Sequence, residues 1–163
     1  MSKYCRNIGL ASEEALKSTQ SHRHGAVITG KGGKVVAAGY NKGNRSKVLN
    51  HVFTCVYAEM DAINKLVNCV LIPKYGRHFR KHTNKFSIWI VRLENSPEIK
   101  YAYSKPCYYC SKLMKEYGFS KVYFTIDKEN IRTEKVCELI PKHKSNCQIN
   151  SEKVDTNIKF KLF

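Results

Sequence analysis

Two short stretches of this 163-residue chain carry side chains that could bind a metal ion and move a proton. They are Tyr57–Ala58–Glu59 and Pro106–Cys107–Tyr108–Tyr109–Cys110, and the second spaces its cysteines as a C-x-x-C pair. Two thiols at the start of a helix can reach one ion, and the metal and the helix dipole both favour the thiolate. A zinc ion lowers the pKa of a bound water to about 7, and a carboxylate that is not a ligand can then carry the proton. The two stretches together indicate metal-assisted hydrolysis.

Alternatives to a metal site stay open for the cysteines. A lone C-x-x-C pair also occurs in redox motifs or as two core thiols. The chain has seven cysteines, an odd number, and in a reducing compartment they would mostly be free thiols or metal ligands instead of a disulfide framework. With no signal-peptide pattern and no apolar run long enough to span a bilayer, we expect an intracellular, cytoplasmic protein without membrane partners.

Hydrophobic periodicity predicts the elements that place these stretches. Glycines 30, 32 and 33 predict a tight turn between the first two strands. Helices are expected over 4–17, 55–68, 106–118 and 127–139, and strands over 24–29, 34–40, 86–93, 121–126 and 158–163. This order predicts an α/β fold in which helices cover a mixed sheet. Length and composition predict one domain over residues 1–163, with a C-terminal segment 141–163 of less defined pattern.

A net charge of +16 predicts an anionic partner such as a nucleotide or nucleic acid. Five of the 29 Lys and Arg residues fall in a basic insertion at 71–85, where they alternate with Tyr75 and Phe79. That composition is typical of a nucleic-acid contact, but it also fits a solvated insertion without a partner. Abundant Lys, Asn, Ile and Tyr are equally explained by an AT-rich genome, so charge alone does not decide between these interpretations.

The two stretches nearly match H-x-E followed by P-C-x-x-C, the signature of zinc-dependent base deaminases. Residues 24–28, 39–41 and 121–124 add to this similarity. The chain therefore resembles the cytidine/deoxycytidylate deaminase superfamily over about residues 4–127. The resemblance is to its deoxycytidylate (dCMP) and tRNA-adenosine deaminase branches in particular. The resemblance implies a three-layer α/β/α sandwich with about five strands. It also implies hydrolytic deamination of cytidine-type nucleotides or bases, zinc as the cofactor, and self-association into a homo-oligomer. The overall composition is similar to that of viral or other AT-rich-genome members.

The resemblance also implies roles for individual residues. Glu59 would be the catalytic proton shuttle, while Cys107 and Cys110 would bind zinc. The substrate would be held by Asn41, Ala58 and Ser104.

The departure from the signature is Tyr57, which stands where the family has His or Cys. A phenol has a pKa near 10 and is an uncommon zinc ligand. Four interpretations remain: Tyr57 binds the metal as phenolate; Cys55 replaces it; the protein is a catalytically inactive deaminase fold that binds nucleic acid or has a structural role; or a histidine was changed to tyrosine, naturally or deliberately.

Overall fold

The computed structural model describes residues 1–43, 46–49, 51–53 and 55–141. The expected strand 158–163 therefore lies outside the described residues. The strands are β1 (Arg23–Thr29), β2 (Val35–Tyr40), β3 (Ser46–Val48), β4 (His51–Phe53), β5 (Ser87–Leu93), β6 (Tyr101–Ala102), β7 (Lys121–Thr125) and β8 (Ile131–Lys135). The helices are α1 (Lys3–Leu16), α2 (Ala58–Leu66), α3 (Ile72–Tyr75) and α4 (Tyr108–Tyr117), with short helical turns η1 (Lys31–Gly33), η2 (Val67–Leu71), η3 (Gly76–Lys85) and η4 (Val136–Glu138).

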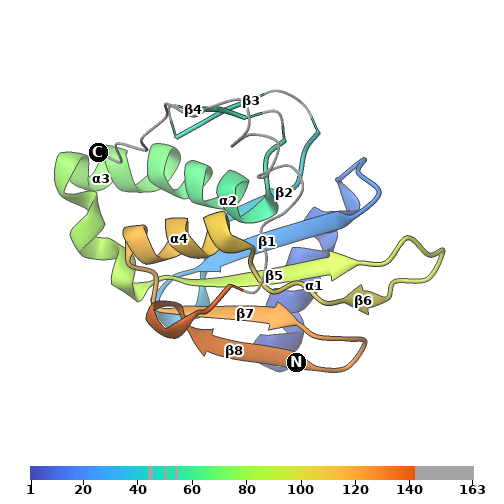
Figure 1. Ribbon diagram of the computed structural model, residues 1–163. Helices are drawn as coiled ribbons and strands as arrows, with labels where there is room; N and C mark the ends of the chain where they lie inside the picture. The colour runs from blue at the N-terminus through green and yellow to red at the C-terminus, as the bar shows by residue number, and fades with distance from the viewer. Residues whose placement is uncertain (44–45, 50, 54, 142–163) are drawn as a thin grey trace.

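One six-stranded sheet forms the centre of the molecule, in the order β2-β1-β5-β7-β8, with β6 paired to β5 (Figure 1). The strands pair antiparallel except β5 and β7, which run parallel. The sheet is therefore mixed, as the sequence predicted. In the β1–β2 turn, Gly32 and Gly33 have φ angles of 79° and 80°, which only glycine adopts without strain.

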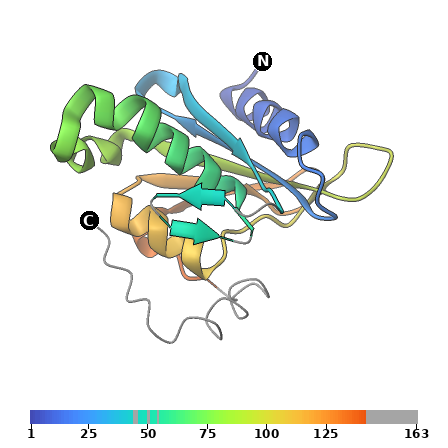
Figure 2. The ribbon, with the colours of Figure 1, turned by 90° about the horizontal axis from the view of Figure 1, so that it is seen from above.

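Alternation along the strands gives the sheet two buried faces. On one face, Val27, Trp89 and Tyr123 pack against α1. On the other, Ile28, Ile90 and neighbouring residues pack against α2 and α4. The result is three layers, with α1 on the opposite side of the sheet from α2 and α4 (Figures 1 and 2). This confirms the predicted α/β/α sandwich, which places the first turns of α2 and α4 over the same sheet face.

The prediction of a helix over residues 127–139 is wrong. The Asp127 carboxylate accepts hydrogen bonds at 3.0 Å from the backbone N–H groups of Glu129 and Asn130, which reverses the chain after β7. Residues Ile131–Lys135 then pair with β7 as the edge strand β8, and only the short turn η4 follows. The turn that the Asp127 side chain stabilises therefore takes the place of the helix that the apolar spacing predicted.

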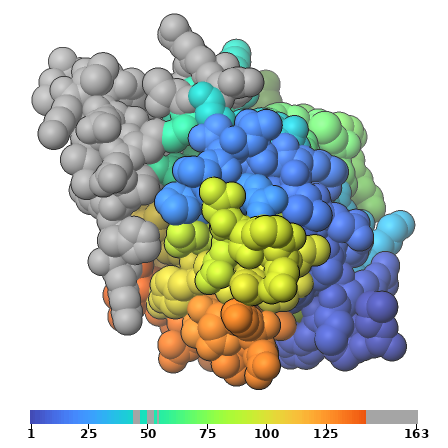
Figure 3. All heavy atoms as spheres, turned by 90° about the vertical axis from the view of Figure 1, so that its right-hand side faces the viewer, coloured from blue at the N-terminus to red at the C-terminus, as the bar shows by residue number. Residues whose placement is uncertain are grey.

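Residues 71–85, expected as a basic loop, are mostly helical. The π-helical η2 extends α2, and α3 and η3 follow before β5 begins. Figure 3 views the opposite end of the molecule, formed by the β5–β6 connection (yellow-green), the β7–β8 turn (orange) and α1 (dark blue). Across the described part of the chain, no helix combines the length and apolarity needed to cross a bilayer.

Candidate functional site

The N-terminal ends of α2 and α4 bring the predicted catalytic and metal-binding side chains into contact. Tyr57 is the N-cap of α2 and Cys107 is the N-cap of α4, both with extended backbone. Cys107 and Cys110 are buried in one cluster with Val56 and Met60, and Tyr57 packs against that cluster. Two stretches about fifty residues apart therefore meet where both helix dipoles place positive potential.

Glu59 is buried beside the two cysteines. Its side chain is hydrogen-bonded with Cys110, and no ion pair among the described residues involves it. Burial, with the negative potential of Cys107 added, raises the pKa of the Glu59 carboxyl to about 8. Glu59 is therefore protonated near neutral pH and positioned to exchange a proton with a neighbouring group.

The two thiols lie against each other. A hydrogen bond with Cys107, together with burial and the nearby Glu59, raises the pKa of the Cys110 thiol well above its usual value. A catalytic zinc site takes three protein ligands, whereas no group of three His, Cys, Asp or Glu side chains able to hold a metal occurs within the described residues. The two thiols therefore supply two of the three donors that such a site needs.

Tyr57, at the position where the resemblance implies a third ligand, is a half-buried residue that packs on the cysteine cluster. Cys55, the alternative donor, is disulfide-bonded in this structure, and a disulfide sulfur is not a thiolate ligand. Of the side chains considered for the third ligand, only the phenol of Tyr57 remains beside the two thiols.

The residues expected to hold the substrate are strongly engaged in the scaffold. The Asn41 side chain accepts a hydrogen bond at 2.8 Å from the His24 backbone N–H and donates one at 2.7 Å to the His22 carbonyl. The Ser104 hydroxyl donates to the Ile90 carbonyl at 2.9 Å and accepts from the Thr125 backbone N–H at 2.9 Å.

Asn41 thus joins the start of β1 to the end of β2, and Ser104 links β5 to β7. Ala58 is fully buried as the first residue of α2, and its lack of a longer side chain permits close packing there.

A buried ion cluster on α2 was missed by the sequence analysis. The Asp61 carboxylate, whose side chain is 8% exposed, pairs with Lys42 at 3.0 Å and Lys65 at 2.9 Å. It also accepts a hydrogen bond at 3.2 Å from the Tyr40 backbone N–H. The i,i+4 spacing of Asp61 and Lys65 was a readable signal, whereas nothing local pointed to Lys42. Asp61 thereby fixes the first turns of α2, which carry Glu59, against the end of β2.

Replacing Asp61 with asparagine is expected to lower the free energy of unfolding by about 1–3 kcal/mol, because the variant loses charge-assisted hydrogen bonds at a buried position. Urea denaturation measures this loss. The matched control is Glu98→Gln, which removes an exposed pair with Lys100 and should cost less than about 1 kcal/mol. Equal costs for the two variants would contradict the role given to Asp61.

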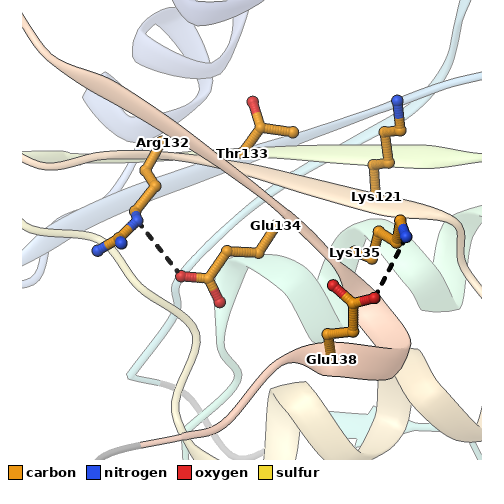
Figure 4. Close-up of a pocket in the computed structure, with 6 residues that line it drawn as sticks. All are labelled: Lys121, Arg132, Thr133, Glu134, Lys135 and Glu138. Atoms are coloured by element: carbon orange, nitrogen blue, oxygen red, sulfur yellow. Dashed lines mark hydrogen bonds and ion pairs between the residues drawn. The ribbon is translucent and has the colours of Figure 1, made fainter.

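A surface hollow of about 460 Å³ lies elsewhere, along β8. It is lined by Lys121, Arg132, Thr133, Glu134, Lys135 and Glu138 (Figure 4). Arg132 pairs with Glu134 at 3.6 Å and Lys135 with Glu138 at 3.2 Å. Its charges thus largely neutralise one another, and the hollow contains none of the predicted site residues.

Comparison with known proteins tests the resemblance. The family profile described as "Cytidine and deoxycytidylate deaminase zinc-binding region" matches residues 1–126. The chain belongs to the cytidine and deoxycytidylate deaminase family. No curated protein matches this family member.

Two solved structures are similar to this deaminase-family chain. The dCMP deaminase of the cyanophage S-TIM5, in apo form, is 21% identical, covering 77% of this chain and 82% of that one, with a TM-score of 0.46. A mutant cytidine deaminase from Mycobacterium tuberculosis is 18% identical, covering 87% of this chain and 98% of that one, with a TM-score of 0.50. At this identity the likeness to the mycobacterial protein concerns the fold.

Proposed function

We propose that this protein hydrolytically deaminates cytidine-type nucleotides at the Glu59–Cys107–Cys110 cluster, and that Tyr57 keeps the activity low by withholding the third zinc ligand. The single observation that carries the proposal is the contact of a buried carboxyl with two buried thiols at the start of two helices. Family membership supports the reaction class.

Glu59 supplies the acid–base chemistry in this proposal. In hydrolytic deamination, the oxygen of a water molecule attacks the ring carbon that bears the amino group, and ammonia leaves from that carbon. One protein group must therefore take a proton from the water and give one to the leaving amine. A carboxyl whose pKa lies near 8 can do both close to neutral pH. The surrounding apolar side chains exclude bulk water, which protects such a proton from exchange.

A zinc titration combined with an ammonia-release assay on dCMP and CMP tests the proposal. The wild-type protein is expected to bind zinc weakly through its two thiols and to turn substrate over slowly. Cys107→Ser should remove the residual zinc binding, because one thiol alone is a poor site. Glu59→Gln should lower turnover by about 10²–10⁴-fold, the usual contribution of a general acid–base group.

A protein that shows no turnover of either nucleotide at saturating zinc would overturn the proposal. That result would favour a catalytically inactive deaminase fold that binds nucleic acid or has a structural role.

A further inference from the structure

The segment from α3 through η3 presents a strongly basic surface at the far end of α2. Its cationic side chains are Lys74, Arg77, Arg80, Lys81 and Lys85, which we call the basic face. All five are exposed. The chain has no acidic residue between Asp61 and Glu94, so no carboxylate of the same segment offsets these charges.

The basic face also lacks acidic partners in space. None of its five members takes part in an ion pair among the residues that the structure describes. Some lysines elsewhere do have acidic partners: Lys42 and Lys65 share Asp61, and Lys105 pairs with Glu134 at 3.2 Å. Five cations without a nearby carboxylate, all within residues 74–85, create a positive potential that attracts anions.

The segment is held on the protein by its inner side. Phe79 stacks on Tyr117 of α4 with ring centroids 6.0 Å apart, and the buried Thr83 hydroxyl donates to the Tyr117 carbonyl. The Arg80 guanidinium lies 5.2 Å from the centre of the Tyr117 ring. These contacts fix the backbone that carries the cations, which reduces the entropy lost when an anion binds.

Aromatic side chains also arrange the outer cations. Tyr75 and His82 stack with centroids 3.8 Å apart, and the ammonium groups of Lys74 and Lys85 each lie 5.3 Å from the Tyr75 ring centre. The rings thus contact one another and the lysines. A ligand would therefore contact charged groups here, and would not find free aromatic faces on which bases could stack.

We propose that the basic face binds the phosphodiester backbone of nucleic acid, without reading its sequence. A run of five cations matches a polymer with one negative charge per nucleotide, and exceeds what a single free nucleotide could neutralise. A membrane surface fits less well, because such segments carry a row of exposed apolar residues. Ile72, which is 44% exposed, is the one exposed large hydrophobic side chain in 72–85.

The binding surface is separate from the Glu59 cluster. The helical run from Ala58 to Leu71 places the face about 20 Å from the start of α2, at 1.5 Å per residue, and Figure 1 shows α3 at the other end of that run. The inference therefore does not depend on the proposed deaminase activity. Nucleic-acid binding and turnover can succeed or fail independently.

Fluorescence anisotropy with a labelled 20-nucleotide dT strand, over a series of salt concentrations, tests the inference. If all five cations contact phosphates, log K should fall against log [salt] with a slope of about −3.5. A mixed-sequence strand should bind with the same affinity as dT.

The test variant combines Lys74→Gln, Arg77→Gln and Lys81→Gln, at three exposed positions of the segment. Removing three phosphate contacts should reduce the slope by about 2 units and weaken binding roughly 10–100-fold at low salt. The matched control combines Lys31→Gln, Lys34→Gln and Lys128→Gln at exposed positions outside the segment. It lowers the net charge by the same amount, from +16 to +13, and should bind within about twofold of wild type.

Urea unfolding of both triple variants checks that they are equally folded. Equal weakening by the two variants would overturn the inference, because net charge alone would then explain binding. So would binding without salt dependence, a strong preference for one sequence, or salt-dependent binding to anionic phosphatidylserine vesicles in the absence of oligonucleotide binding.

Discussion

Replacing Tyr57 with histidine is expected to raise zinc affinity by on the order of 1,000-fold, equivalent to about 4 kcal/mol. The reason is the ligand count. Cys107 and Cys110 already lie together, and Tyr57 packs on their cluster as the N-cap of α2. An imidazole at this position would add a neutral nitrogen donor, whereas the phenol must first lose a proton whose pKa is near 10. Equilibrium competition with a chromophoric chelator measures the change.

Two further variants make the Tyr57 result decisive. Tyr57→Phe keeps the ring and removes the phenol oxygen, so it should bind zinc as weakly as wild type. A large loss in Tyr57→Phe would instead show that the phenolate is a ligand. The double variant Tyr57→His, Cys110→Ser should lose the gained affinity, because the imidazole acts only with both thiols. If Tyr57→His binds no more zinc than wild type, the third ligand is not what limits this site.

Substituting Gly25 with alanine is expected to cost about 3 kcal/mol or more of folding free energy. A Cβ at Gly25 would lie 1.9 Å from the Ala11 carbonyl oxygen and 2.5 Å from the Ala15 backbone nitrogen. These are backbone atoms of α1, so the clash cannot be relieved by a side-chain rotation. The helix must shift away from β1 and loosen the face that contains Trp89. The midpoint of urea unfolding reports this loss.

Gly9→Ala is the matched control, since it makes the same chemical change on the helix that faces Gly25. Gly9 is inside α1, and a Cβ there would have no atom within 4 Å apart from the adjacent residues and the backbone of the helix itself. Alanine there should stabilise the protein by up to about 1 kcal/mol through helix propensity. If Gly25→Ala unfolds at the same urea concentration as Gly9→Ala, the close approach of α1 to β1 does not limit stability.

Sequence patterns were sufficient where local signals agreed with the tertiary structure. The β-branched and aromatic residues of 86–93 predicted the central strand, and the helix expected over 106–118 does end at Gly118, which adopts a φ of 73°. The C-x-x-C spacing and Glu59 also indicated which residues would share a site, and the structure brings them together. Their catalytic and metal-binding roles stay predictions.

Sequence patterns were insufficient where contacts distant in the chain decided the outcome. The apolar spacing of 127–139 resembled a helix, but pairing with β7 and the Asp127 turn made it an edge strand. Ser104 carried no local sign that its hydroxyl would join two strands. Lys42 likewise gave no indication that it would reach Asp61, because that contact exists only after β2 packs on α2.

The pairing of β1 with β5 has a kinetic consequence. It joins residues 58 to 70 positions apart, from Thr29 with Ser87 to Arg23 with Leu93. Chain closure over such separations loses entropy before the contacts repay it, so topologies of this kind fold on the slow side for their size. The contact of Glu59 with Cys107 and Cys110 likewise joins residues 48 and 51 positions apart, and α4 lies on the crossover from β5 to the parallel strand β7. The contact between Glu59 and the two cysteines is therefore expected to be a late event in folding.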